Sequence, residues 1–156
     1  MKNLIIYFSR TGNTKKISEE IQKKLNCDIE EINTEGDYNG MLEYMRAGKE
    51  ASLKKLPAIK TLSKNPADYD LVIIGTPVWA FNMSSPIRTF ITENNDKFKS
   101  IALFCTQGGT PGSTIKNMAE LAGKEPLSSF DINDKEVQQI NYESIISLFI
   151  KKLLTN

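Results

Sequence analysis

Small hydrogen-bonding side chains gather in the stretch SRTGNT, between a short apolar run and a helical pattern. The stretch combines hydroxyl and amide groups with one glycine: Ser9, Thr11, Gly12, Asn13 and Thr14. The start of a helix offers unpaired N–H groups and the positive end of its dipole, so the stretch predicts a site for a phosphate monoester. It matches neither the Walker A pattern nor GxGxxG. An ordinary capped turn is the alternative, because these residue types are common in turns.

A second stretch, TPVWAFN from Thr76 to Asn82, carries the one tryptophan of the chain, Trp79, with Phe81 two residues later. Aromatic side chains exposed at the end of an apolar strand favour a surface on which a flat heteroaromatic ring stacks. The alternative is that Trp79 packs against a neighbouring helix.

A third stretch, TQGGTPG from Thr106 to Gly112, also follows an apolar run. Its paired glycines would let backbone amides approach the edge of a ligand. A flexible turn is the alternative. The three stretches together favour a binding site more strongly than any one of them alone.

The composition excludes several kinds of catalysis. The chain has no histidine, which removes Ser-His-Asp and Cys-His catalysis and imidazole metal ligation. Cys27 and Cys105 lie far apart without metal or redox spacing, and each is expected to be a small buried apolar residue. We therefore expect neither a metal site nor a catalytic side chain, and any chemistry would come from a bound cofactor.

The overall balance of the sequence is that of an ordinary globular protein. The 156 residues predict one domain covering residues 1–156. The net charge of +1 gives no reason to expect nucleic acid as a partner. No apolar run approaches the length of a membrane span, and the first residues predict a strand rather than a signal peptide. A cytoplasmic protein without a membrane partner is the default expectation.

Five runs of residues predict strands. Three are continuous and apolar, which is typical of strands covered on both faces: Leu4–Phe8, Leu71–Gly75 and Ile101–Cys105. Two are more polar and predict outer strands: Cys27–Asn33 and Pro126–Asn133.

Apolar residues at helical spacing predict five helices that alternate with these strands. The first two cover Asn13–Asn26 and Met41–Leu53, the second with Met41, Leu42 and Met45 facing inward. A third has Ser85 as its N-cap and Pro86 in its first turn, and a fourth lies between a Ser113 cap and a Gly123 stop. The last has a stripe of Tyr142, Ile145, Ile146, Phe149 and Leu153. The stretch Pro57–Ala67 predicts a surface loop.

The alternation predicts an α/β fold, a parallel sheet with helices on both faces. If the most apolar strands are central, the strand order is 2-1-3-4-5. In such a sheet ligands bind outside the carboxyl ends of the strands, where the order reverses between strands one and three. SRTGNT and TPVWAFN follow those two strands, so topology and residue types indicate the same crevice.

The motifs SRTGNT, DYDLVIIGTPVW and FCTQGGTPG resemble the three flavin-contacting loops of the flavodoxin family, and the resemblance covers essentially the whole chain. It implies a flavodoxin-like three-layer sandwich of the short-chain type and non-covalently bound FMN. By position it implies a phosphate loop of Ser9, Arg10, Thr11, Gly12, Asn13 and Thr14. It implies ring contacts from Thr76, Pro77, Val78, Trp79, Ala80, Phe81 and Asn82, with Trp79 as the stacking ring. It implies contacts to the pyrimidine edge from Thr106, Gln107, Gly108, Gly109 and Thr110.

The leading hypothesis is an FMN-dependent electron carrier that passes electrons between redox partner proteins, as a monomer or homodimer. The alternative is an FMN-dependent NAD(P)H:quinone-type oxidoreductase that reduces a small acceptor. Three departures from the family pattern bear on this choice: no second aromatic in TQGGT, no glycine in WAFNMSS, and a nearly neutral charge. A receiver-type signalling domain is a third reading, but Ser9, Arg10 and Thr11 stand where receivers need clustered carboxylates.

Overall fold

The structure is a computed structural model that describes residues 1–35 and 40–155. Within these residues the sheet has six strands: β1 (Asn3–Tyr7), β2 (Asp28–Glu31), β3 (Leu71–Trp79), β4 (Asn82–Met83), β5 (Ser100–Gln107) and β6 (Ser129–Asn133). The helices are α1 (Asn13–Leu25), α2 (Met41–Ser52), α3 (Ser85–Asn94), α4 (Thr114–Ala122), α5 (Asp134–Gln138) and α6 (Glu143–Thr155), with 3-10 turns at Pro66–Asp68 and Asn95–Lys97.

The predicted sheet order is confirmed. The parallel strands lie in the order β2-β1-β3-β5-β6, which is 2-1-3-4-5 for the five predicted strands. Tyr7 is in register with Gly75, and Gly75 with Phe104, so β1, β3 and β5 reach the same edge of the sheet. The prediction missed β4, which pairs antiparallel with the end of β3.

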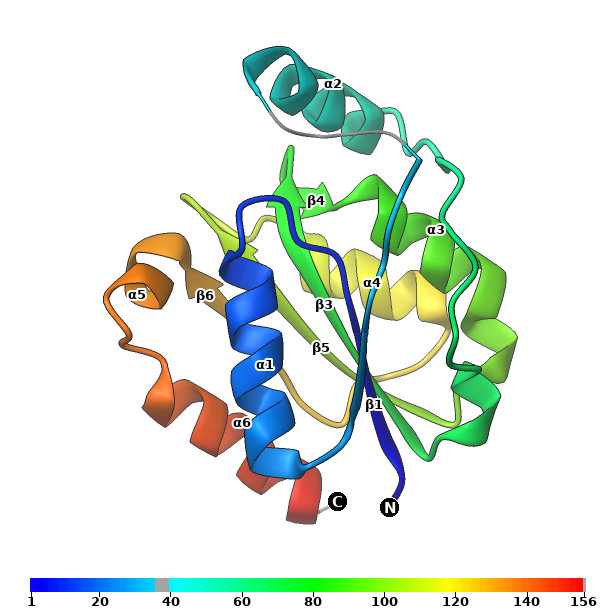
Figure 1. The fold of residues 1–156 in the computed structure, drawn as a ribbon, viewed down its shortest axis with the longest axis vertical. Coiled ribbons are helices and arrows are strands. Elements are labelled where there is room, and N and C mark those ends of the chain that lie inside the picture. Colours follow the sequence, from blue (N-terminus) through cyan, green and yellow to red (C-terminus); the bar gives the residue numbers. More distant parts are fainter. Residues whose placement is uncertain (36–39, 156) are drawn as a thin grey trace.

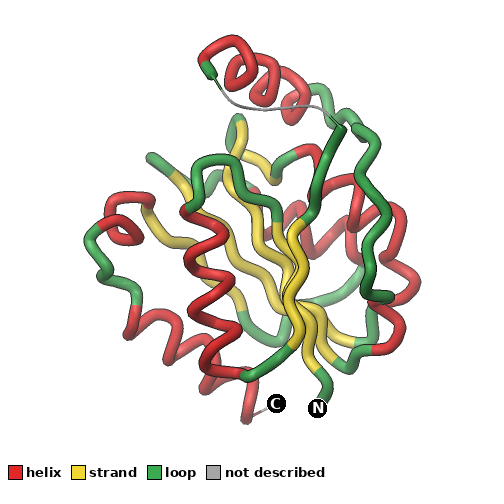
Figure 2. Tube along the Cα trace, in the orientation of Figure 1, coloured by secondary structure: helices red, strands yellow, loops and turns green. Residues whose placement is uncertain are grey.

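Helices cover both faces of this sheet (Figures 1 and 2). Alternate residues of each strand point to opposite faces, so Ile5 and Ile73 belong to one apolar cluster and Ile6 and Ile74 to the other. The first cluster is closed by α1, α5 and α6, and the second mainly by α3 and α4. Strands covered on both faces need to be apolar throughout, which explains the continuous runs in the sequence.

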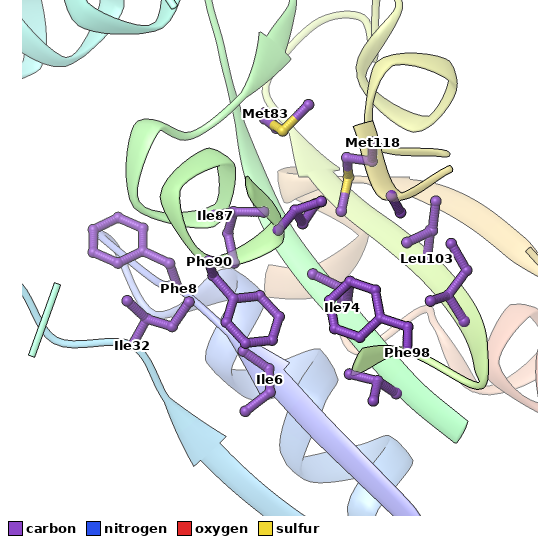
Figure 3. Packing of buried hydrophobic residues seen from close by; sticks show 14 of the residues in the cluster. Ile6, Phe8, Ile32, Ile74, Met83, Ile87, Phe90, Phe98, Leu103 and Met118 are labelled. Atoms are coloured by element: carbon purple, nitrogen blue, oxygen red, sulfur yellow. The ribbon is translucent and has the colours of Figure 1, made fainter. Parts of the chain in front are cut away.

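The second cluster extends to the carboxyl edge of the sheet. Figure 3 shows Met83 of β4 beside Met118 of α4, and Phe8 beside Ile32 at the end of β1. All four side chains are buried. The apolar core therefore supports the loops that follow the strands.

The helix α2 differs from its predicted orientation. Leu42 and Met45 were expected to face inward, yet both are exposed, while Ala47 and Ala51 are buried. The side chain of Met41 lies outside the described residues. Figure 1 shows α2 beyond the carboxyl edge of the sheet rather than flat on one face, and among its described side chains Ala47 and Ala51 are the fully buried ones.

Two smaller features differ from prediction, and a third agrees with it. The residue that precedes α3 as its cap is Ser84, and Ser85 is already the first helical residue. The short helix α5 was not predicted, although Asn133 and Glu136 form a capping box at its start. The stretch Pro57–Ala67 is mostly loop, as predicted, and Thr34 forms an isolated bridge with Ile59.

Candidate functional site

The loop after β1 is organised by one hydroxyl group. The Ser9 Oγ accepts hydrogen bonds from the backbone N–H groups of Gly12 and Lys15, both at 3.2 Å. Gly12 precedes α1 with a φ of +95°, a left-handed conformation that glycine adopts readily. The serine hydroxyl keeps its own hydrogen available for a ligand outside the loop.

Backbone donors remain free at this loop. Within the described part of the chain, the N–H groups of Thr11, Asn13 and Thr14 donate to no protein acceptor. The first turn of α1 carries no acidic residue that would compete for them. Free N–H groups at the positive end of a helix dipole form a binding site for an anion.

The two lysines near this loop have other contacts. The Lys15 ammonium lies 3.7 Å from a carboxylate oxygen of Glu31, and the Lys16 ammonium lies 5.7 Å from the centre of the Tyr142 ring. Both ammonium groups thus have partners within the protein surface. An anion at this loop would be held chiefly by neutral donors.

A hydrogen bond joins the first loop to the third. The hydroxyl oxygens of Thr14 and Thr106 lie 2.8 Å apart, and both side chains are buried. The hydroxyl of Thr14 is thus used inside the protein, whereas its N–H group stays free. This contact fixes the start of α1 against the end of β5.

The second stretch forms a β-hairpin rather than an open loop. Trp79 pairs with Asn82 across a two-residue turn of Ala80 and Phe81. Both turn residues have positive φ, 48° and 62°. Tight hairpin turns of this kind normally use Asn-Gly or similar pairs, because other residues are strained there. Ala80 and Phe81 therefore carry no turn signal from which the hairpin could have been predicted.

Thr76 secures the base of this hairpin. Its hydroxyl oxygen accepts the Ser84 N–H at 3.0 Å and lies 3.1 Å from the Ser84 hydroxyl. Thr76 is fully buried, so it supports the hairpin instead of lining its surface. Pro77, Val78 and Asn82 are half-buried.

The prediction that Trp79 is exposed is wrong for this structure. Its side chain is only 4% exposed and packs edge-on against Phe8, with ring centres 5.4 Å apart. Phe81, at the tip of the turn, is 66% exposed. Both rings were expected to be exposed at the end of the strand, but Trp79 belongs to β3 and is buried, whereas Phe81 lies in the turn and is exposed.

The third stretch contacts both the sheet edge and the hairpin. The side chain of Gln107 is buried and donates to a carboxylate oxygen of Asp131 at 3.1 Å. Gly108, Gly109 and Thr110 are exposed. Gly108–Thr110 are therefore the part of this stretch that is open to a ligand.

Gly112 allows the close approach of the hairpin, which residue types alone did not predict. It has a φ of +56°, and a Cβ at this position would lie 2.5 Å from the Phe81 carbonyl oxygen. That oxygen also accepts the N–H of Ser113 at 3.2 Å. The tip of the hairpin and the start of α4 are thus fixed together.

The structure brings the three predicted stretches together at the carboxyl edge of β1, β3 and β5 (Figure 1). Ser9–Thr14 form the first loop, Thr76–Asn82 the hairpin, and Thr106–Thr110 the third loop. The role of each residue toward a ligand stays a prediction.

The cysteines take no part in the surface of this site. Burial raises the pKa of Cys105 to about 12, and burial also raises the pKa of Cys27, which is half-buried, to about 11. Across residues 1–35 and 40–155 no group of three or more His, Cys, Asp or Glu side chains could hold a metal ion. Nor does any helix described there have the length and apolar character needed to cross a membrane.

Comparisons with known proteins place this geometry in context. Residues 2–147 match a protein-family model described as Flavodoxin. A flavoprotein from Lactobacillus acidophilus NCFM, solved in complex with FMN, is 28% identical with a TM-score of 0.73, covering 88% of this chain and 97% of that one. No curated protein matches the chain.

Two further structures are similar. A candidate flavoprotein from Bacteroides eggerthii DSM 20697 is 25% identical with a TM-score of 0.72, and the match covers 94% of this chain and 98% of that one. The two-electron reduced flavodoxin from Megasphaera elsdenii has a TM-score of 0.56 with 85% of each chain covered. At 18% identity that likeness concerns the fold alone.

Proposed function

We propose, from the premise that the chain belongs to the flavodoxin family, that it binds FMN without a covalent bond and transfers electrons between redox partners. The observation that carries the proposal is the meeting of three features at one edge of the sheet. These are the free N–H groups around Gly12, the exposed ring of Phe81 and the exposed amides of Gly108 and Gly109.

The residues present fit the phosphate end of FMN. The N–H groups of Thr11, Asn13 and Thr14 are available, and no carboxylate lies in the first turn of α1. A Cβ at Gly12 would meet no atom within 4 Å, so the space beside the loop is open. These groups would hold a phosphate through neutral donors, with the hydroxyl of Ser9 as a further donor.

The residues present also fit a flat ring. The hairpin would flank it through Phe81, whose exposed ring lies at the tip of the turn. The exposed backbone of Gly108 and Gly109 offers N–H donors to the polar edge of such a ring. Trp79 would support the hairpin from behind, since it packs on Phe8 instead of facing solvent.

Bound FMN would supply the capacity to accept and donate electrons singly or in pairs. The chain itself would hold the phosphate at α1, fix the ring between the hairpin and the third loop, and leave one edge open to a partner. Such a carrier requires no protein side chain that acts as an acid or base.

The test compares FMN with riboflavin, which has the same ring but lacks the phosphate. Protein stripped of flavin is titrated with each, and quenching of flavin fluorescence gives the affinity. We expect FMN to bind at least a hundredfold more tightly than riboflavin. The Ser9→Ala variant removes the acceptor that folds the loop, and it should weaken FMN binding while leaving riboflavin binding unchanged. Equal binding of the two flavins by the natural protein would contradict the proposal.

The second candidate is an FMN-dependent NAD(P)H:quinone-type oxidoreductase. It is favoured by the absence of an aromatic residue in Thr106–Thr110 and of a glycine at the hairpin turn, since both would relax control over one-electron transfer. Rapid bleaching of the oxidised flavin by NADPH alone would favour the enzyme. Slow bleaching by NADPH, with fast reduction by a one-electron reductase protein, would favour the carrier.

A further inference from the structure

The beginning of α3 buries an arginine that has no partner. The side chain of Arg88 is only 7% exposed, and its Nε and Nη2 atoms are buried without a hydrogen bond. Among the residues that the structure describes, no carboxylate forms an ion pair with it. Burial lowers the pKa of Arg88, and no neighbouring carboxylate counteracts this effect. A buried charge without a partner is costly, which favours an anion from outside the chain.

The two unpaired atoms of Arg88 lie on one edge of its guanidinium group. Nε–H and Nη2–H point in parallel from the same side of the planar group, and such an edge donates to both oxygens of a carboxylate at once. The planar fork is rigid, so both bonds form with little further loss of side-chain freedom. The buried donors that lack a partner are therefore the pair suited to a carboxylate.

A hydroxyl group lies on the same side of α3. Ser85 is completely buried, and its Oγ makes no hydrogen bond to the described residues, so its hydrogen is also available. Ser85 and Arg88 are three residues apart and share one side of the helix, whereas Ile87 and Phe90 belong to the apolar core (Figure 3). Because helical side chains extend toward the helix N-terminus, the guanidinium of Arg88 is directed at the first turn, where Ser85 lies.

The backbone of this first turn adds further donors. Within residues 1–35 and 40–155 the N–H groups of Ser85 and Ile87 donate to no acceptor, whereas that of Arg88 donates to the Ser84 carbonyl oxygen at 3.0 Å. The first turn carries no acidic residue, and the Ser84 side chain makes no capping hydrogen bond. The positive end of the α3 dipole and the buried guanidinium thus favour negative charge at the same place.

The surroundings limit the size and charge of a ligand at this turn. Helix α2 contacts α3 and β4, and the Thr89 hydroxyl donates to the carbonyl oxygen of Pro57 at 2.8 Å, so other segments lie against α3 here. A ligand enclosed in this way must be small. A monoanion would neutralise Arg88, whereas a phosphate dianion would leave a net negative charge buried.

We propose that the beginning of α3 binds a small carboxylate between Arg88 and Ser85. Its two oxygens accept from Nε and Nη2 of Arg88, and the Ser85 hydroxyl supplies a further donor. The site is on a different helix from the phosphate loop and does not rest on the proposed function. Ser84, which directly precedes α3, donates its N–H to the Thr76 hydroxyl at 3.0 Å, so a bound carboxylate would fix the helix directly behind the hairpin.

The experiment follows the Nε–H signals of the three arginines, Arg10, Arg46 and Arg88, in nitrogen-15 NMR spectra. The full chain is titrated at constant ionic strength with sodium acetate, and separately with acetamide, a neutral molecule of the same shape. We expect the Arg88 signal to shift saturably with acetate and not with acetamide. Phosphate at pH 8, where it is mostly a dianion, should bind there at least tenfold more weakly. The titration is repeated with FMN bound, which occupies the phosphate loop and should leave the acetate response unchanged.

Three variants make the test specific. In the natural chain, acetate at ten times its dissociation constant should raise the melting temperature by about 4 °C. Arg88→Met keeps the unbranched stem without the charge, so it should lose this gain and, without acetate, melt no lower than the natural chain. Ser85→Ala removes one donor and should weaken acetate binding at least threefold. Arg46→Met is the matched control, because Arg46 is exposed and paired with Glu43 and Glu50, and its response to acetate should be unchanged.

Several results would overturn the proposal. One is an Arg88 signal that moves only linearly with acetate, or equally with acetamide. Another is an Arg88→Met chain that acetate stabilises as much as the natural one; if Arg88→Met does not fold, unchanged acetate binding by Ser85→Ala decides against the site. If Arg88→Met lowers FMN affinity as much as acetate binding, Arg88 serves the flavin and not a second ligand. A chain that binds acetate at Arg88 but ignores FMN would refute the proposed function alone.

Discussion

The loop after β1 and the hairpin after β3 lie side by side and are built in opposite ways. In the first loop the positive φ falls on Gly12, which adopts it without strain, and the hydroxyl of Ser9 accepts two backbone hydrogen bonds. The loop leaves other N–H groups free for a ligand. The hairpin instead places Ala80 and Phe81 at positive φ, where non-glycine residues cost of order 1–3 kcal/mol each. The first loop therefore depends on backbone shape, and the hairpin maintains a strained backbone to present a side chain.

The largest expected effect on stability comes from Gly75, which lies inside β3 below the hairpin. A Cβ at Gly75 would lie 2.2 Å from the Cζ of Phe104, and the Phe104 ring is stacked on Phe130. Gly75→Ala should therefore reduce the free energy of unfolding by about 3 kcal/mol, as measured by urea denaturation. Because β3 would move away from β5, the hairpin should be displaced more than the first loop.

Gly48→Ala is the matched control for Gly75→Ala, because its Cβ meets nothing within 4 Å. It should leave stability unchanged or raise it by about 1 kcal/mol. Phe104→Leu combined with Gly75→Ala should recover part of the loss. A Gly75→Ala chain as stable as the natural one would show that β3 and β5 are packed more loosely than the structure indicates.

Features that follow from local residue types could be predicted from the sequence, and features that depend on tertiary contacts could not. The central strands follow from runs such as Leu71–Gly75, because strands covered on both faces must be apolar. The first loop was recognisable because its residue types match their roles: Ser9 accepts hydrogen bonds from the backbone, and Gly12 adopts a positive φ. The hairpin was not, since Ala80 and Phe81 lack turn chemistry and are held there by tertiary contacts with Gly112 and Ser113.

Helix α2 shows a second limit of prediction from sequence. Its large apolar residues, Met41, Leu42 and Met45, predicted an inward face, yet Leu42 and Met45 are exposed, and the buried ones among its described side chains are Ala47 and Ala51. Helical spacing indicates that a helix has an apolar stripe, but not whether that stripe meets the sheet. Which side of α2 is buried depends on where the helix lies in three dimensions.

The second prediction tests the contact that couples the first loop to the third. Thr14→Val leaves the buried hydroxyl of Thr106 without its partner and should lower the free energy of unfolding by about 2 kcal/mol. Thr14→Val with Thr106→Val removes both hydroxyls and should cost less than the sum of the single changes. Additive losses in urea denaturation would mean that the two hydroxyls do not interact.

The third prediction removes the strain from the hairpin. Ala80→Asn combined with Phe81→Gly gives the pair that a turn with two positive φ values prefers, so the free energy of unfolding should rise by about 1 kcal/mol. FMN should bind about tenfold more weakly, because the ring at the tip is lost. Phe81→Tyr is the control that keeps the ring, and it should leave both quantities close to those of the natural chain. A stability loss in the Asn-Gly chain would refute the strain argument.

The smallest expected effect concerns the two cysteines, whose rate of labelling by a disulfide reagent reports on how tightly the folded chain covers them. The buried Cys105, whose pKa is about 12, is in register with Thr76 at the base of the hairpin. Folding favours its protonated form, so this contribution to stability is complete below the ordinary pKa of 9.0 and is lost as the pH rises toward 12.

At pH 8 a disulfide reagent should label neither cysteine of the folded chain quickly, and denaturant should expose both. As the pH is raised above 9, the half-buried Cys27 should react first, which a Cys27→Ser chain identifies. Fast labelling of Cys105 at pH 8 would mean that the elements covering this end of β5 open in the folded chain, and the site edge would then be mobile rather than fixed.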